Sequence, residues 1–295
     1  MLDILTKAAK NWNNDDPFRH AAIIAYYAIF SMPGLLIIVI WFAGAVFGQD
    51  AVQGQLSEQL TRYLGDSGST SIEKIIANAR LDRDNPWMKI LGIGTLVFGA
   101  TTLFLQLQKS LNEIWGVKSA ARNGLLKLLA DRATSLGVII AIGFLLLISL
   151  IMSTTISIIA SWIETSLGPS WLFIIRAINI TLSIGLTSLL FALMFKVLPD
   201  VDIRWRSVWT GAITAGLMFT IGKTLLGIYF GYSQPGNTFG AAGSIILVML
   251  WINYTCLILF FGANVAQAYA VQRGHPITPS AHAEWLAASR SRVNT

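Results

Sequence analysis

The sequence predicts an all-α, polytopic membrane protein with six transmembrane helices, and three observations support this. Of the 295 residues, 54% are hydrophobic and only 12% are charged, whereas soluble domains carry about 25% charged residues. The mean hydropathy is +0.62. Six runs reach the length of a spanning helix, which needs about 20 mainly apolar residues. These runs are residues 21–48, 88–109, 133–161, 171–197, 208–231 and 241–270.

The distribution of lysine and arginine orients the predicted helices, because cytoplasmic loops carry an excess of both. Basic residues gather before the first run, after the second and fourth runs, and after the sixth. Residues 49–86 instead balance their basic residues with acidic ones. We therefore expect both termini on the cytoplasmic side and residues 49–86 on the other. The net charge of +6 then fits loops that face anionic lipid and is no sign of nucleic-acid binding.

Short amphipathic helices are expected at both membrane faces, together with a broken first span. Residues 1–13 place apolar side chains on one helical face beside two lysines, which predicts a helix lying on the inner leaflet. Residues 49–86 carry two similar apolar stripes on the outer side. Pro33, followed by Gly34, removes a backbone hydrogen bond near the middle of the first span and predicts a kink there.

Polar residues recur along the predicted spans, and two cations lie away from the ends of their spans. Small and hydroxyl residues pack membrane helices through contacts of about 0.6–2 kcal/mol each, so packing alone explains those. An arginine or lysine facing lipid at the bilayer centre costs about 2.5–3.5 kcal/mol. Arg176 and Lys223 fall at similar depths in the outer halves of the fourth and fifth spans. Snorkelling to the outer headgroups and a functional role both stay open, and Lys223, on a face of small residues, fits snorkelling less well.

The predicted functional site is a polar, basic cavity open to the outer side. Water, an anion or a lipid phosphate would compensate its two cations. Its candidate residues come from four spans and are Lys223, Arg176, Asn179, Asn253, Ser183 and Gln106. At the inner end of the fifth span, Arg204, Trp205 and Arg206 are expected to anchor the helix at the interface.

Several segments resemble the YihY/BrkB family of bacterial inner-membrane proteins. They are AAIIAYYAIFSMPGLL (Ala21–Leu36), LNEIWGV (Leu111–Val117), LPDVDIRWRSVWTGA (Leu198–Ala212) and FGAAGSIILVMLW with FGA (Phe239–Trp251, Phe261–Ala263). The resemblance covers nearly the whole chain and implies a multi-pass protein of the bacterial inner membrane with both termini cytoplasmic. Members of the family commonly carry an acidic residue where this chain has Asn264. An asparagine has no carboxylate, so the resemblance does not imply a role in proton coupling at this position. Some relatives have been labelled ribonuclease BN.

The residues do not support catalysis, and no enzyme, cofactor or metal is expected. A ribonuclease needs clustered metal ligands or an acid/base pair facing water. The histidines, His20, His275 and His282, lie near span ends or in the tail. Asp200 and Asp202 are the best acidic pair, and charge pairing with a helix start explains them. The chain has no HExxH, no GxSxG and no glycine-rich phosphate loop.

Two functions fit these features. A transporter or permease for an anion or an anionic lipid would use the broken helix, the polar seams (the rows of polar residues along the spans) and the two cations. The alternative is a non-transporting structural or envelope-assembly protein, whose seams would be closed by side-chain contacts. Expected partners are the lipid bilayer, anionic lipids at the cytoplasmic face and an unidentified substrate, but no nucleic acid, and a homo-oligomer is left open. Residues 1–272 would form the membrane domain and residues 273–295 a disordered cytoplasmic tail.

Overall fold

A computed structural model describes residues 1–48, 86–119, 172–233, 243–280 and 283–286, together with Gly54 and Gly137. Within these ranges helices dominate. The elements are α1 (Leu2–Asn14), α2 (Pro17–Phe47), α4 (Pro86–Trp115), α6 (Leu172–Val197), α7 (Trp205–Ser233) and α9 (Gly243–Gln272). The predicted span 133–161 and nearly all of the predicted outer segment 49–86 lie outside the described residues, apart from Gly137 in the former and Gly54 and Pro86 in the latter.

Three of the described helices are long and apolar enough to cross a membrane. They are Ile180–Val197, Trp205–Ile228 and Ile245–Gln272. These stretches coincide with the fourth, fifth and sixth apolar runs of the sequence. The first and second runs also form long helices, α2 and α4. The described part of the chain is thus mostly helical, with three candidate spans.

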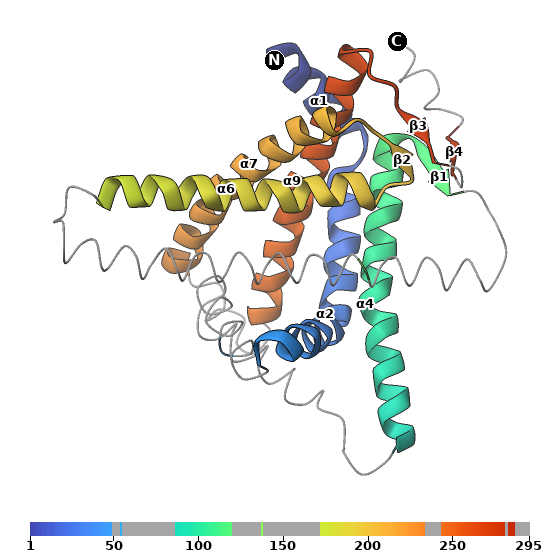
Figure 1. The fold of residues 1–295 in the computed structure, drawn as a ribbon, viewed down its shortest axis with the longest axis vertical. Helices are drawn as coiled ribbons and strands as arrows, with labels where there is room; N and C mark the ends of the chain where they lie inside the picture. The colour runs from blue at the N-terminus through green and yellow to red at the C-terminus, as the bar shows by residue number, and fades with distance from the viewer. Residues whose placement is uncertain are drawn as a thin grey trace.

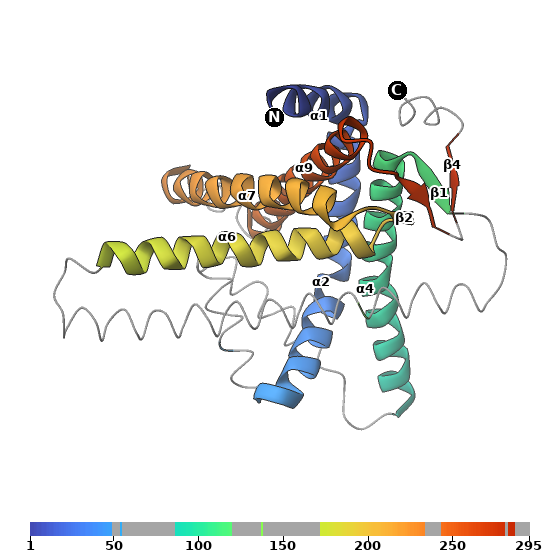
Figure 2. The ribbon, with the colours of Figure 1, turned by 45° about the horizontal axis from the view of Figure 1, so that its top comes forward.

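The long helices form two pairs that α9 joins. α2 packs beside α4, α6 packs beside α7, and α9 packs against both α2 and α7. In both views α6 lies across α4 rather than along it (Figure 1, Figure 2). α6 and α7 run in opposite directions (Figure 2), as the short connection between them requires.

Helix α2 continues without a break through Pro33 and Gly34. It changes direction in the half that holds these two residues, where the ribbon turns from dark to light blue (Figure 1, Figure 2). Proline lacks the N–H that would bond one turn back, which weakens a helix at such a point. In the half before Pro33, Ala21 and Ile24 are buried in the core.

Helix α1 packs on the protein through the face that was expected to rest on lipid. Ile4 and Ala8 are buried against Val265 and Ala268 of α9. The amphipathic pattern therefore predicted the helix, but the inner-leaflet placement is wrong for these two residues. Leu5, on the same helix, is 38% exposed, so only part of the apolar face is covered.

Two short strand pairs correct the prediction of a disordered tail over residues 273–295 for its described part, residues 273–280 and 283–286. The strands are β1 (Val117–Ser119) paired antiparallel with β4 (Ala283–Trp285), and β2 (Val201–Asp202) paired antiparallel with β3 (Thr278–Pro279). The backbone N–H and C=O groups of the tail thus find partners in two earlier loops, and Ile277 is buried beside them. Residues 287–295 lie outside the described residues.

The core lies where α9 meets the two helix pairs. Its largest fully buried side chains include Trp115, Phe195 and Phe260. Two glycines bring α7 and α9 close together: a Cβ on Gly211 would clash with the carbonyl oxygen of Gly262. Close backbone approach through small residues is how membrane helices pack in the absence of a hydrophobic drive.

Candidate functional site

Two of the sequence-predicted site residues meet between α6 and α7. The ammonium of Lys223 on α7 donates to the hydroxyl of Ser183 on α6, with Nζ and Oγ 3.4 Å apart. Both side chains are half-buried. Helices α6, α7 and α9 contain no aspartate or glutamate, so none of the three can supply a carboxylate to this cation.

The other candidates are distributed over three helices. Arg176 and Asn179 lie on α6, about two turns and one turn before Ser183, and their side chains lie outside the described ones. Asn253 is half-buried on α9. Gln106 is half-buried on α4, which packs mainly against α2 and α9. The structure therefore joins Lys223 to Ser183 and does not bring Gln106 to this pair.

Ala212, Gly216 and Gly227 share the face of α7 that carries Lys223, and this small-residue seam is closed at one end. Ala212 is fully buried, and a Cβ on Gly216 would clash with the hydroxyl of Ser188. At Gly227, near the other end, no described atom lies within 4 Å of the Cβ position. Lys223 lies between these two ends, one turn before Gly227.

The predicted interface anchors are exposed where α7 begins. Arg204 and Arg206 are exposed, and Trp205 is 51% exposed. The acidic neighbour Asp202 pairs with Lys196, whose Nζ lies 3.6 Å from its Oδ1, rather than with these arginines. The structure thus places three large polar or aromatic side chains at one helix start.

Asp200 joins three separate segments, which the sequence did not indicate. Its carboxylate accepts hydrogen bonds from Gln108 at 3.2 Å, Asn112 at 2.9 Å and Ser119 at 3.1 Å. Its backbone N–H donates to the Asn112 side-chain oxygen at 2.7 Å, and its carbonyl accepts from the N–H of Ser280 at 3.0 Å. Neutral donors rather than the following arginines therefore hold this carboxylate. It ties the end of α4, the β2 loop and the tail together.

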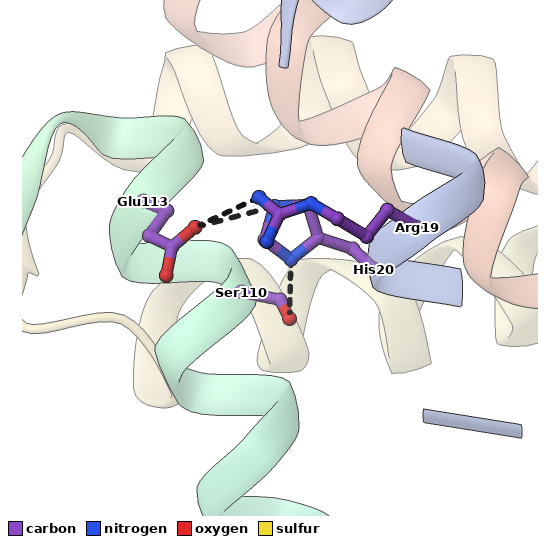
Figure 3. A network of polar contacts seen from close by, with 4 residues as sticks. All are labelled: Arg19, His20, Ser110 and Glu113. Carbon is purple, nitrogen blue, oxygen red and sulfur yellow. Dashed lines mark hydrogen bonds and ion pairs between the residues drawn. The ribbon is translucent and has the colours of Figure 1, made fainter. Parts of the chain in front are cut away.

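A second polar cluster surrounds His20, at the contact between α2 and α4 (Figure 3). The imidazole is 4% exposed. Its Nδ1 lies 3.0 Å from Ser110 Oγ and its Nε2 lies 3.2 Å from Glu113 Oε2. The guanidinium of Arg19 lies 3.4 Å from Nε2 and 3.9 Å from the same carboxylate oxygen. Ser110 and Glu113 face His20 together because residues three apart share a helix face, and that spacing was the signal available in the sequence.

The His20 cluster has the residue types of a serine–histidine–acid triad but not its accessibility. Ser110 is 1% exposed, so no substrate carbonyl can approach its hydroxyl. Burial lowers the pKa of His20 below its ordinary 6.5, and Glu113 opposes this by favouring the charged ring. His20 is therefore neutral at pH 7 and acts as a buried hydrogen-bonding group.

The comparison with known proteins gives the family. A family model described as "Virulence factor BrkB" matches residues 8–285. The chain belongs to the BrkB family. This confirms the resemblance seen in the sequence.

Curated relatives of this BrkB-family chain are named UPF0761 membrane proteins. The one from Saccharophagus degradans is 26% identical over 273 residues, which is 91% of this chain and 60% of the relative. The one from Alcanivorax borkumensis is 23% identical over 273 residues, 90% and 60% of the two chains. The one from Psychromonas ingrahamii is 25% identical over 250 residues, 83% and 80%. The chain thus spans 60% of the length of the first of these relatives. No solved structure matches it.

Both polar clusters draw residues from the segments that carried the resemblance, or from directly beside them. Leu111–Val117 and Leu198–Ala212, two of the segments that carried the resemblance, meet at Asp200 through the Asn112 contact. Glu113 of the first segment contacts His20, which directly precedes a third segment, Ala21–Leu36. Asn264 is fully buried on α9 and donates to the Phe260 carbonyl at 3.1 Å. Its Oδ1 accepts no hydrogen bond from the described residues.

Proposed function

We propose that this BrkB-family membrane protein is a transporter or permease for an anionic substrate, either a free anion or an anionic lipid. The observation that carries the proposal is the contact between Lys223 and Ser183 inside two helices that are long and apolar enough to cross a membrane. Ionisable residues within membrane helices are costly, and they mark substrate or ion pathways.

The direction of the lysine supports a site over snorkelling. A snorkelling lysine keeps its ammonium among headgroups, whereas this ammonium donates to a hydroxyl on the neighbouring helix. A negatively charged ligand suits this position, because a partly desolvated cation is stabilised by an opposite charge nearby. We also include Arg176, Asn179 and Asn253 in the proposed cavity, because the sequence predicts that they lie on polar faces of their spans.

The proposal places the protein in the bacterial inner membrane with six spans and both termini cytoplasmic, and it assigns no enzymatic activity. Arg204, Trp205 and Arg206 would then lie at the cytoplasmic face against anionic lipid. The substrate is identified only by its charge.

A structural or envelope-assembly role is the second candidate, and one observation favours it. The seam of α7 is closed by contact at Gly211 against Gly262 and at Gly216 against Ser188. Helices that only pack would show such closure along their whole length. The two candidates differ at Gly227, one turn beyond Lys223, where no described atom lies within 4 Å of the Cβ position.

Flux measurements with the full chain in liposomes separate the two candidates. Two probes would be used: efflux of chloride or phosphate, and flipping of fluorescent phosphatidylglycerol against phosphatidylcholine. We expect one anionic probe to cross faster than in protein-free vesicles, and Lys223→Met to slow it by about tenfold or more, since a hydrogen bond to a charged group contributes about 1.5–3 kcal/mol.

The matched control is Lys109→Met, which removes an exposed lysine from α4 and should leave the flux unchanged. An equal loss in both variants would assign the effect to net charge rather than to the site. No flux above protein-free vesicles for either probe would favour the structural role.

A further inference from the structure

The imidazole of His20 faces charged groups from its own helix region and from α4. Within the described residues, the groups that act on it electrostatically are Arg19, Glu113, Asp15 and Asp16. Helix α9 packs against it through the Phe260 ring, with centroids 6.0 Å apart, and α9 contains no charged residue. The lysines of α1, Lys7 and Lys10, are exposed. The charge balance of His20 is therefore set mainly by one cation and one carboxylate that meet at Nε2.

Only one of these two neighbours can hydrogen-bond to Nε2 at a time. Arg19 has N–H donors and no acceptor, whereas ionised Glu113 has acceptors and no donor. The guanidinium lies 3.4 Å from Nε2 and the Glu113 oxygen 3.2 Å from it. An unprotonated Nε2 can accept from Arg19, and a protonated Nε2 can donate to Glu113. The other ring nitrogen, Nδ1, keeps its contact with Ser110 at 3.0 Å in both arrangements.

We propose that His20 is a proton-operated switch at the α2–α4 contact, in which one proton on Nε2 exchanges Arg19 for Glu113 as the partner of the ring. In the neutral state Nδ1–H donates to Ser110 and Nε2 accepts from Arg19. On acidification, a proton from solvent adds to the Nε2 lone pair, and the hydrogen bond from Arg19 is lost. The cluster gains one positive charge, and Nε2–H forms a charge-assisted hydrogen bond to Glu113.

The exposure of the groups provides a path for that proton and for the exchange. The side chains of Glu113 and Arg19 are 54% and 61% exposed, whereas His20 is buried. Water therefore reaches the groups that meet at Nε2, and Arg19 can turn into water when it is displaced. Because burial lowers the pKa of His20, the exchange occurs on acidification below the ordinary value of 6.5 and not at neutral pH. The switch does not depend on the transport proposal.

Nitrogen NMR of a single histidine tests the switch directly. The chain has 3 histidines, so His275→Gln with His282→Gln leaves His20 alone in ¹⁵N-histidine-labelled full chain in lipid nanodiscs. We expect the Nδ1–H tautomer at pH 7.5, and a shift of Nε2 to the protonated position with a midpoint below 6.5. An Nε2–H tautomer at pH 7.5, or a midpoint at or above 6.5, would overturn the proposal.

Two neighbouring substitutions should move that midpoint in opposite directions. Glu113→Gln removes the anionic acceptor and should shift it to lower pH, and Arg19→Gln removes the opposing cation and should shift it to higher pH. Glu284→Gln is the matched control, because its carboxylate lies 4.0 Å from Lys118 in a surface pair. It should leave the midpoint in place. Midpoints that do not move in either test variant contradict the exchange, and the tautomer of the parent protein decides it if a variant does not fold.

Discussion

The carboxylate of Asp200 connects parts of the chain that lie far apart in sequence. Its donors Gln108 and Asn112 precede it by 92 and 88 positions. A buried donor that loses its acceptor costs about 1–3 kcal/mol, so this carboxylate should contribute measurably to the stability of this end of the molecule. A residue with this role cannot be recognised from hydropathy, since the pattern does not encode which loop meets which.

Replacing this carboxylate tests its structural role. Asp200→Asn turns one acceptor oxygen into a donor that faces the amides of Gln108 and Asn112, and we expect a loss of about 1–3 kcal/mol in the free energy of unfolding. Thermal and denaturant unfolding of the purified protein measure it. Asp202→Asn is the matched control: that side chain is 75% exposed beside Lys196, so the change should stay within about 1 kcal/mol. Equal effects of the two substitutions would contradict the role of Asp200.

At the same scale, part of the Lys223 site could be predicted. The sequence placed Lys223 and Ser183 on polar faces of neighbouring antiparallel spans, and they are in contact. It did not predict the partners of His20, because Ser110 lies 90 positions away on another helix. The free-energy cost of placing a polar or charged side chain in lipid shows which residues need a partner within a membrane. It does not show which residue that partner is.

Among the elements, the hydropathy runs located the long helices well because a spanning helix leaves a signal of about 20 residues. The strand pairs had no such signal, since elements of two or three residues show no measurable alternation. The tail was therefore predicted to be disordered although its backbone pairs with two loops. The amphipathic pattern predicted helix α1. It could not show whether lipid or another helix covers Ile4 and Ala8, which the structure buries against α9.

The contact between α7 and α9 offers a prediction at the scale of elements. Gly211→Ala would place a methyl group against the backbone oxygen of Gly262 and the side chain of Ala266. Because a backbone oxygen cannot turn aside as a flexible side chain can, the helices must separate, and overpacking of this kind costs about 1–3 kcal/mol. Thermal unfolding should show the loss. Gly227→Ala, where no described atom lies within 4 Å, should be neutral or slightly stabilising. A Gly211→Ala protein as stable as the parent would show that this contact is loose.

For the whole molecule, the crossing of the two helix pairs is the feature that no sequence pattern predicted. α6 lies across α4 in both views (Figure 1, Figure 2), whereas transmembrane helices tilt by about 0–40° from one common normal. In the six-span arrangement proposed above, the α6–α7 pair would have to turn relative to α2 and α4. Periodicity gives the length and face of each helix, but the angles between helices arise from packing.

Cysteine labelling tests the proposed topology. In a Cys256→Ala background, Ser67→Cys should react with an impermeant thiol reagent added to intact cells, because residues 49–86 are predicted on the outer side. Asn14→Cys, at the exposed end of α1, should react only after lysis. Labelling of Ser67→Cys only in lysed cells would reverse the orientation, and labelling of both in intact cells would place them on the same outer side.

The two strand pairs also set an order of events during synthesis. β1 and β2 need β4 and β3 as partners, and these partners leave the ribosome after α4, α6, α7 and α9. At about 5–20 residues per second, the chain between Asp200 and Ser280 takes roughly 4–16 s to make. During that time β1 and β2, at the ends of α4 and α6, have been synthesised but their partner strands have not. Insertion of the long helices must therefore succeed without this contact, and the strand pairing closes only on a chain whose earlier helices are already in place.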